Sequence, residues 1–231
     1  MVSGRGFLVF ATKDCSVTTK FNQFDLSQET LKALDALGFE KPFPIQVEAI
    51  PVALSGQDII GLARTGTGKT LAFSLPMIEK IDAENRSIQA LVICPTRELT
   101  VQVVEEIKKL LKFNSKVKVA AIYGGVSIEG QLKNLKKGVH IVVGTPGRIM
   151  DHLHRGTMYV DGANMVVLDE ADEMLSMGFR EDIESILKTT PKDRQTLLFS
   201  ATMSPKILRL TKNFQRCPEV IKVTDDTAAS H

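Results

Sequence analysis

Short apolar runs alternate with longer amphipathic segments over most of the chain. Six runs have the length of strands, at residues 58–63, 90–94, 117–123, 140–143, 165–168 and 196–199. Several are apolar without strict alternation, as is typical of a parallel sheet with both faces covered. Helical periodicity occurs at residues 27–37, 45–54, 69–81, 98–111, 127–135 and 179–187. The pattern predicts βαβ units, and therefore an α/β fold with a mainly parallel central sheet and helices on both faces.

The alternating elements extend far enough to predict one large domain in this chain of 231 residues. Residues 1–20 show no clear periodicity, and residues 225–231 are typical of a frayed tail or linker. The composition, 43% hydrophobic and 24% charged, is ordinary for a globular protein. We therefore expect an extension at 1–20, a domain at 21–224 and a tail at 225–231.

Charge and cysteine content narrow the expected partners and compartment. A formal charge of +2 gives no strong overall attraction to a polyanion, so any contact with nucleic acid has to be local. Cys15, Cys94 and Cys217 match neither a disulfide framework nor a zinc pattern. No run approaches the roughly 20 apolar residues that cross a bilayer. We expect no membrane association and a reducing intracellular compartment, the cytoplasm or, in a eukaryote, also the nucleus.

The predicted strand at 58–63 runs into a glycine-rich segment, residues 63–70 (ARTGTGKT), which opens a predicted helix. Glycines let backbone amides converge on phosphate oxygens, and the start of the helix adds positive potential. Lys69 can then reach the β and γ phosphates, and Thr70 can ligate magnesium. Ala63 replaces the first glycine of the general pattern, but the flanking strand and helix are intact. This phosphate loop predicts nucleotide contacts from Arg64, Thr65, Gly66, Thr67, Gly68, Lys69 and Thr70.

Two adjacent carboxylates follow the predicted strand at 165–168. In P-loop NTPases an aspartate at this position holds magnesium, and a neighbouring glutamate can orient or deprotonate the attacking water. We therefore assign Asp169 to magnesium and Glu170 to the base, with Lys69 as the third catalytic residue. Taken alone, the acidic residues could equally form the acid-rich start of a helix.

Six motifs together resemble the DEAD-box RNA helicases. They are ARTGTGKT (63–70), PTREL (95–99), GG (124–125), TPGR (145–148), DEAD (169–172) and SAT (200–202). Each is weak alone, but six in the order and approximate spacing of the family are very specific. The resemblance covers residues 21 to about 223 and implies the first of two RecA-like P-loop NTPase domains. It also implies ATP and magnesium as ligands, RNA as partner, and ATP hydrolysis coupled to unwinding as the activity.

Upstream, residues 38–46 (GFEKPFPIQ) are similar to the Q motif of that family, which recognises adenine. An amide can pair with both the donor and the acceptor of the adenine edge. The resemblance assigns this role to Gln46, with Phe39 stacking on or bordering the base and Phe21 as the isolated upstream aromatic residue. Phe43 stands where the family more often has threonine. Core packing stays open as an alternative for Phe21 and Phe39, and a surface position for Gln46.

PTREL, GG and TPGR follow three different strands, and the resemblance implies that they line an RNA surface. We expect this surface along the strand ends opposite to the phosphate loop. Hydroxyls, helix-start amides and arginines read the sugar–phosphate backbone, which predicts little sequence preference. The residues expected to bind RNA are Pro95, Thr96, Arg97, Gly124, Gly125, Thr145, Pro146, Gly147 and Arg148. An intradomain ion pair stays open for Arg97. A solvated helix face is favoured over an RNA site for Lys108, Lys109, Lys112, Lys116 and Lys118.

The last motif implies a coupling role. In the family, SAT links the state of the nucleotide to RNA strand separation, so Ser200 and Thr202 are expected to hydrogen-bond near Asp172. Turn capping is the alternative. The 29 residues after Thr202 are too few for the second RecA-like domain, which contributes arginine fingers. We therefore expect this chain alone to bind nucleotide with little turnover.

Two other functions stay open on the sequence. One is a nucleotide-dependent binding module that never hydrolyses. The other is a P-loop ATPase that acts on DNA or remodels proteins, which the combination of the DEAD tetrapeptide with Gln46 disfavours.

Overall fold

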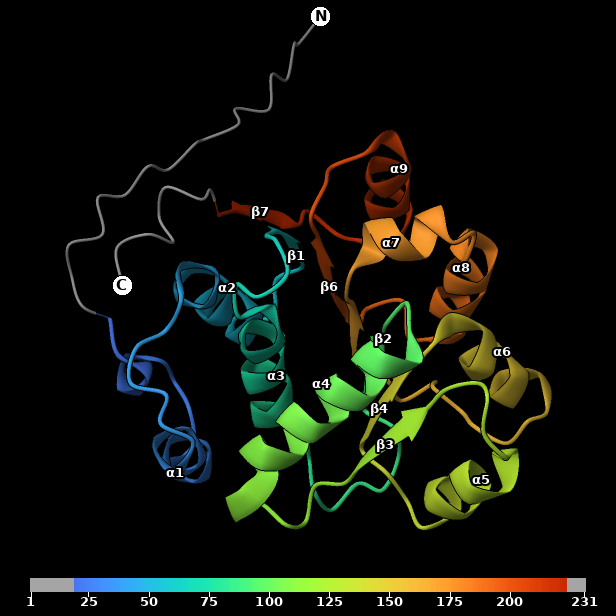
Figure 1. Cartoon of the computed structure of the whole chain (residues 1–231), viewed down its shortest axis with the longest axis horizontal. Coiled ribbons are helices and arrows are strands. Elements are labelled where there is room, and N and C mark those ends of the chain that lie inside the picture. The colour runs from blue at the N-terminus through green and yellow to red at the C-terminus, as the bar shows by residue number, and fades with distance from the viewer. Residues whose placement is uncertain (1–18, 224–231) are drawn as a thin grey trace, which may run out of the picture.

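Seven strands form one sheet in the computed structural model, which describes residues 19–223. They lie in the order β3-β4-β2-β5-β6-β1-β7, and all neighbours pair in parallel (Figure 1). The strands are β1 (Ile59–Leu62), β2 (Ala90–Ile93), β3 (Val119–Ile122), β4 (Ile141–Gly144), β5 (Met165–Leu168), β6 (Gln195–Ser200) and β7 (Glu219–Lys222). The predicted α/β fold is confirmed, with a sheet that is parallel throughout.

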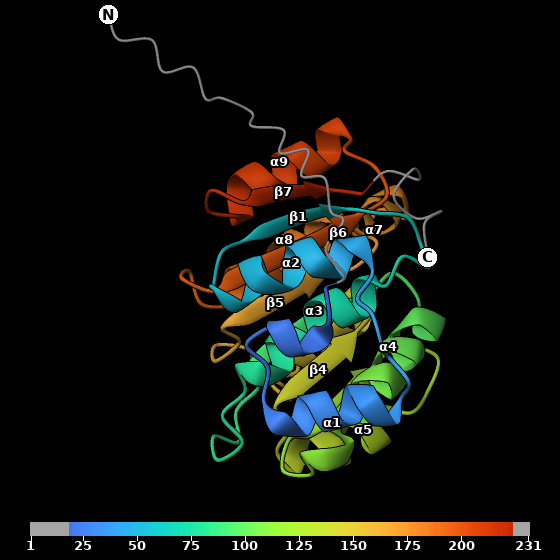
Figure 2. The same ribbon diagram turned by 90° about the vertical axis from the view of Figure 1, so that its left-hand side faces the viewer.

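Helices cover both faces of the sheet, as predicted. One face carries α1 (Gln28–Ala36), α2 (Pro44–Leu54), α3 (Lys69–Glu79) and α4 (Arg97–Leu110), which lie in front of the sheet in Figure 2. The other carries α5 (Ile128–Lys136), α6 (Pro146–His154), α7 (Ala171–Ser176), α8 (Arg180–Thr189) and α9 (Pro205–Phe214). Two short 3₁₀ helices, η1 (Phe21–Gln23) and η2 (Leu111–Phe113), complete the described part.

The two faces have separate hydrophobic cores because successive side chains of a strand point to opposite sides. In β2, Val92 packs into the core beneath α1–α4, whereas Leu91 and Ile93 pack into the core beneath α6–α9. All four residues of β2 are buried. This two-sided burial explains why the central strands are continuous apolar runs in the sequence.

The six predicted strands and six predicted helices are all present, with ends shifted by at most two residues. Strand β7, helices α6, α7 and α9 and the two 3₁₀ helices were not predicted. The expected extension and tail fall mostly on residues 1–18 and 224–231, which lie outside the described residues, so these boundaries stay predictions.

Because all strands run in parallel, each loop that follows a strand emerges at the same edge of the sheet. The loops after β1, β5 and β6 are neighbours on one half of this edge, and those after β3, β4 and β2 are neighbours on the other half. The sheet thus sorts the six sequence motifs into two groups of three.

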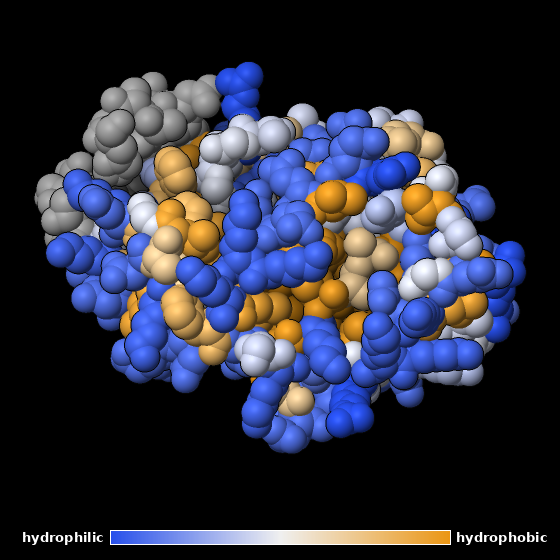
Figure 3. Space-filling model, turned by 60° about the horizontal axis from the view of Figure 1, so that its bottom comes forward, coloured by the Kyte–Doolittle hydropathy of each residue, from blue (hydrophilic) through white to orange (hydrophobic). Residues whose placement is uncertain are grey.

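None of the helices among the described residues is both long and apolar enough to span a bilayer. Figure 3 shows the lower side of the view in Figure 1, where hydrophilic side chains surround a central band of hydrophobic ones.

Candidate functional site

The glycine-rich loop between β1 and α3 has the backbone of a phosphate loop. Gly66 and Gly68 adopt left-handed conformations, with φ of 84° and 87°, which glycine accepts without a steric penalty. Helix α3 starts at Lys69, directly after Gly68, so the amides of its first turn point toward the loop. Lys69 itself is largely buried, with 7% of its surface exposed. The predicted strand, loop and helix are therefore confirmed as a local structure.

A cavity of about 460 Å³ joins the phosphate loop to the Q-motif residues and to the end of β5. Seven of its lining residues are among those predicted to bind nucleotide: Phe39, Gln46, Thr65, Gly66, Gly68, Lys69 and Thr70. Asp169 and Glu170 line it as well. Segments separated by more than 100 residues thus converge on one space that is large enough for a nucleotide.

Gln46 fastens the start of α2 to the phosphate loop. Its side chain is 2% exposed, its Nε2 donates to the Gly68 carbonyl at 2.9 Å, and its Oε1 accepts from the Phe43 amide at 2.9 Å. An amide has a second N–H and a second acceptor position, so Gln46 retains one donor and one acceptor for a base. A mere surface position for Gln46 is excluded, whereas its contact with adenine stays a prediction.

Phe21 lies apart from this cavity. It is buried and packs edge-on against Phe24 and Phe39, with ring centroids 6.1 and 6.5 Å away. Phe21 and Phe39 line a separate groove of about 660 Å³, and Phe39 also lines the cavity at the phosphate loop. The geometry therefore agrees with the core-packing alternative for Phe21. Phe21 contacts the cavity only indirectly, through the ring of Phe39. Phe43 is exposed and lines the cavity at the phosphate loop.

Asp169 is a buried carboxyl group with one oxygen unpaired. It is 2% exposed, and its Oδ1 has no hydrogen-bond partner among residues 19–223. Burial raises the pKa of Asp169 to about 6, and the Glu170 carboxylate adds to the rise while the Lys69 ammonium opposes it. A buried, under-coordinated carboxylate oxygen is costly unless a cation or donor completes it.

Glu170 has a strained backbone at the point where β5 ends and α7 begins. Its φ of 53° and ψ of 50° lie in the left-handed region, which costs a non-glycine residue about 1 kcal/mol. The Thr65 hydroxyl lies 3.4 Å from Glu170 Oε1, which places this carboxylate beside the phosphate loop. Strain of this kind is concentrated at functional sites.

Asp172 connects the DEAD residues to the end of β6. The Thr202 hydroxyl donates to Asp172 Oδ2 at 2.9 Å, while Ser200 Oγ donates to the Thr202 carbonyl at 2.8 Å. Asp172 and Thr202 line a second cavity of about 400 Å³ with Thr65, Lys69 and Glu170. The hydrogen bond expected between the two motifs is confirmed, although Ser200 also stabilises the turn, as in the capping alternative.

The PTREL, GG and TPGR residues lie together on the other half of the sheet edge, after the adjacent strands β2, β3 and β4. The expectation that they lie at the strand ends opposite to the phosphate loop is wrong. A parallel sheet brings every loop that follows a strand to its carboxyl edge, so the two groups of motifs share that edge side by side. Thr145, Gly147 and the glycine pair are at least partly exposed, whereas Pro95 and Pro146 are buried.

The two arginines of this half make contacts within the domain. The Arg97 guanidinium lies over the Tyr123 ring, 5.1 Å from its centroid, which is a cation–π contact rather than the ion pair considered above. Arg148 donates from Nη2 to the Val126 carbonyl at 3.2 Å and from Nη1 to Gln131 Oε1 at 3.4 Å. Arg97 is exposed, and Arg148 is half-buried.

Sequence reasoning missed one wall of the cavity at the phosphate loop. Helix α4 contributes Gln102, Glu106 and Lys109 to its lining, one turn apart along the helix. Of these three, only Lys109 was considered from the sequence, as part of a solvated helix face, because a sequence does not reveal which cavity a polar face borders. The solvated-face prediction holds for Lys108 and Lys116, which pair with exposed glutamates at 2.8 Å.

Comparisons with known proteins agree with this geometry. The family model described as DEAD/DEAH box helicase matches residues 43–210. The chain is 54% identical over 205 residues to an ATP-dependent RNA helicase CshA of Listeria monocytogenes, covering 89% of this chain and 39% of the relative. It is 53% identical to a DEAD-box ATP-dependent RNA helicase CshA of Geobacillus kaustophilus, covering 89% of this chain and 44% of the relative.

A solved structure gives the same fold. The crystal structure of a DEAD box protein from the hyperthermophile Methanococcus jannaschii matches with a TM-score of 0.85 and 48% identity, over 89% of this chain and 56% of that one. The chain spans about two fifths of the length of the curated relatives it matches.

Proposed function

Because the chain belongs to the DEAD/DEAH box helicase family, we propose that it is the ATP-binding RecA-like domain of an ATP-dependent RNA helicase. In this proposal the domain couples the binding and hydrolysis of ATP to the binding of RNA and the unwinding of duplexes. The names of the relatives support the activity, and a cytoplasmic location is part of the same proposal.

One observation carries the nucleotide site: a single cavity is lined by Gln46, the phosphate loop and the two carboxylates that follow β5. Gln46 reads the adenine edge with the donor and acceptor that its internal hydrogen bonds leave over. The loop amides and Lys69 hold the phosphates. The distribution of the lining residues therefore matches the base at one end of ATP and the phosphates at the other.

Asp169 and Thr70 would hold the magnesium ion that accompanies the nucleotide. The unpaired buried Oδ1 of Asp169 fits a cation, and carboxylate and hydroxyl oxygens are ligands that magnesium accepts. Among residues 19–223 no group of three or more His, Cys, Asp or Glu could hold an ion, which fits a metal bound largely through phosphate oxygens and water. When bound, magnesium neutralises charge on the phosphate oxygens.

The reaction is transfer of the γ phosphoryl group to water. The water oxygen bonds to the γ phosphorus, the bond to the bridging β–γ oxygen breaks, and ADP and inorganic phosphate form. Glu170 orients the water and takes up its proton, which its position beside the phosphate loop allows. Lys69 and the loop amides stabilise the charge that spreads over the γ-phosphate oxygens.

RNA binds along the half of the edge formed by the loops after β3, β4 and β2. Helices α5, α6 and α4 begin there, so three positive helix ends are arranged side by side. Such ends and free hydroxyls contact phosphates and sugars rather than base edges, which gives little sequence preference. The second RecA-like domain of the full-length protein completes this surface and supplies arginines to the nucleotide site.

Hydrolysis of ATP by the purified chain, with and without single-stranded RNA, tests the proposal together with nucleotide binding. We expect nucleotide binding with little or no turnover, and Glu170→Gln controls for contaminating ATPase activity. Failure to bind nucleotide would refute the ATP site. RNA-stimulated turnover that Glu170→Gln abolishes would refute the need for a second domain. Continued inactivity after joining the chain to that domain would instead favour a binding module that does not hydrolyse ATP.

A further inference from the structure

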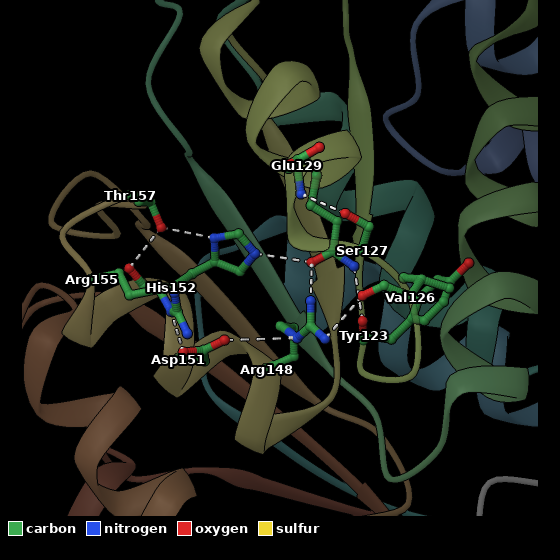
Figure 4. A network of polar contacts seen from close by, with 10 residues as sticks. Tyr123, Val126, Ser127, Glu129, Arg148, Asp151, His152, Arg155 and Thr157 are labelled. Atoms are coloured by element: carbon green, nitrogen blue, oxygen red, sulfur yellow. Dashed lines mark hydrogen bonds and ion pairs between the residues drawn. The ribbon is translucent and has the colours of Figure 1, made fainter.

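A buried hydrogen-bond network lies beneath the loops of the RNA half and is not explained by nucleotide binding. It joins the loop after β3 to the start of α6, which follows β4 (Figure 4). Arg148, in the first turn of α6, donates hydrogen bonds from both terminal nitrogens: Nη2 donates to the Val126 carbonyl and Nη1 to Gln131 Oε1. Arg148 thus braces the neighbouring loop, which carries Gly124 and Gly125.

Gln131 is the centre of the network. This α5 side chain is 6% exposed, donates from Nε2 to the Tyr123 carbonyl at 2.8 Å, and accepts at Oε1 from Arg148. His152 Nε2 lies 2.9 Å from the same Oε1. The reversed amide would set two oxygens against each other at Tyr123 and two nitrogens at Arg148. The partners therefore fix the orientation of the Gln131 amide.

His152 anchors Gln131 from α6. It is fully buried, and burial together with the Arg148 charge lowers the pKa of His152, which keeps the ring neutral at physiological pH. Since Gln131 Oε1 can only accept, His152 Nε2 carries the proton. The Thr157 hydroxyl, 2.9 Å from Nδ1 and 3.1 Å from the His152 carbonyl, shares its one proton between these two acceptors. Each polar atom of the His152 ring thus has a partner in the fold.

The network also extends toward the third loop of this half. The Tyr123 carbonyl accepts the hydrogen bond from Gln131, and the Tyr123 ring lies under the Arg97 guanidinium of the PTREL loop. One chain of contacts therefore runs from the PTREL loop through Tyr123 and Gln131 to Arg148 and His152. It crosses all three loops that the proposed function assigns to RNA.

We propose that Gln131 and His152 are positioning residues of the RNA surface, which hold the loops after β3 and β4 in one fixed relation. Both side chains are buried, so they act without touching RNA. This inference rests on the proposed RNA binding. Its physical basis is that phosphate contacts from several loops add up only if the loops are held at a fixed spacing.

Gln131→Met and His152→Leu remove the polar contacts at similar side-chain size, and His152→Gln can restore the donor to Gln131. Asn134→Met and His154→Leu are matched controls, because Asn134 and His154 are exposed on the same two helices. The affinity for a fluorescein-labelled oligouridylate is measured by anisotropy, and the affinity for a fluorescent ADP analogue is measured in parallel. Hydrogen exchange of residues 123–127 reports the order of the loop.

We expect Gln131→Met and His152→Leu to weaken RNA binding about fivefold, as for the loss of one to two hydrogen bonds. Nucleotide affinity should stay within about twofold of wild type, exchange should rise at 123–127, and His152→Gln and both controls should resemble wild type. Unchanged RNA affinity, or a parallel fall in nucleotide affinity, would overturn the inference.

The two proposals fail in different ways. A wild-type chain that binds no oligouridylate would refute the proposed RNA binding by this domain, and with it the role in RNA recognition. Hydrogen exchange would still test whether Gln131 holds the loop at 123–127 in place. Faster exchange at 123–127 in Gln131→Met would uphold the bracing, and unchanged exchange would refute it.

Discussion

Asp169, the residue proposed to bind magnesium, lowers the stability of the fold at neutral pH. Its carboxyl group is buried, and its pKa is raised to about 6 because burial disfavours the charged form. Between pH 4 and 6 the folded chain therefore holds a proton that the unfolded chain has released. The free energy of unfolding therefore falls as the pH rises from 4 to 6, and it stays lower at neutral pH.

Asp169→Asn removes this cost, because the amide does not ionise. We expect the variant to be more stable than wild type by about 3 kcal/mol above pH 6, a difference that shrinks toward zero near pH 4. Urea denaturation from pH 4 to pH 8 measures it. Glu173→Gln is the control, since the exposed Glu173 is hydrated in both states and its curve should run parallel to wild type. A pH-independent effect of Asp169→Asn would contradict the argument.

The positions of the candidate catalytic residues could be predicted from the sequence where a motif fixed both the residue type and the strand that it follows. Lys69, Asp169 and Glu170 converge as expected because each follows a strand of one parallel sheet. The internal partners could not be predicted. The bonds from Gln46 to Gly68 and from Gln131 to His152 span 22 and 21 residues, and they depend on how helices pack.

At the scale of elements, the packing of α2 against α3 shapes the proposed nucleotide site. Gln46 near the start of α2 reaches the carbonyl of Gly68, immediately before α3. A Cβ atom on Gly68 would lie 2.3 Å from Gln46 Nε2 and 2.9 Å from Phe43 Cδ2. A Cβ atom on Gly66, which has nearly the same φ, would meet no atom of the described part of the chain within 4 Å.

Gly66→Ala and Gly68→Ala therefore separate backbone strain from the clash between elements. We expect Gly66→Ala to lower the free energy of unfolding by about 1 kcal/mol through strain alone. Gly68→Ala should cost about 1 to 3 kcal/mol more, because Gln46 has to leave its buried position. Adding Gln46→Ala should recover part of that extra cost in a double-mutant cycle followed by urea denaturation. Equal effects of the two alanines would show that the packing of Gln46 does not matter.

The elements that were not predicted were missed for different reasons. Strand β7 buries one residue of four, Ile221, because it lies at the edge of the sheet, so no apolar run marks it. Helices α6 and α7 begin inside TPGR and DEAD, segments that were interpreted for their chemistry rather than their periodicity. Helix α9 did have a start signal, the capping Ser204 followed by Pro205.

At the scale of the whole molecule, the strand order separates two surfaces on one edge. The loops after β1, β5 and β6 form the proposed ATP site, and those after β3, β4 and β2 form the proposed RNA surface. The boundary runs between β2 and β5, which pair directly through residues such as Ile93 and Leu168. The two sites are therefore neighbours in one rigid sheet but share none of the residues assigned to either.

This division predicts that the two ligands can be lost separately in the isolated chain. Lys69→Ala should weaken nucleotide binding about tenfold or more, since it removes a charge-assisted contact with phosphate, and should leave the affinity for oligouridylate within about twofold. Arg97→Ala should do the reverse, weakening RNA binding and lowering its salt dependence by about one counterion. Arg180→Ala is the matched control, because Arg180 is exposed and paired with Glu184 on α8. Equal losses of RNA affinity in Lys69→Ala and Arg97→Ala would mean that the two halves of the edge already communicate within this domain. Clean separation would place their coupling in contacts that each half makes with the second RecA-like domain.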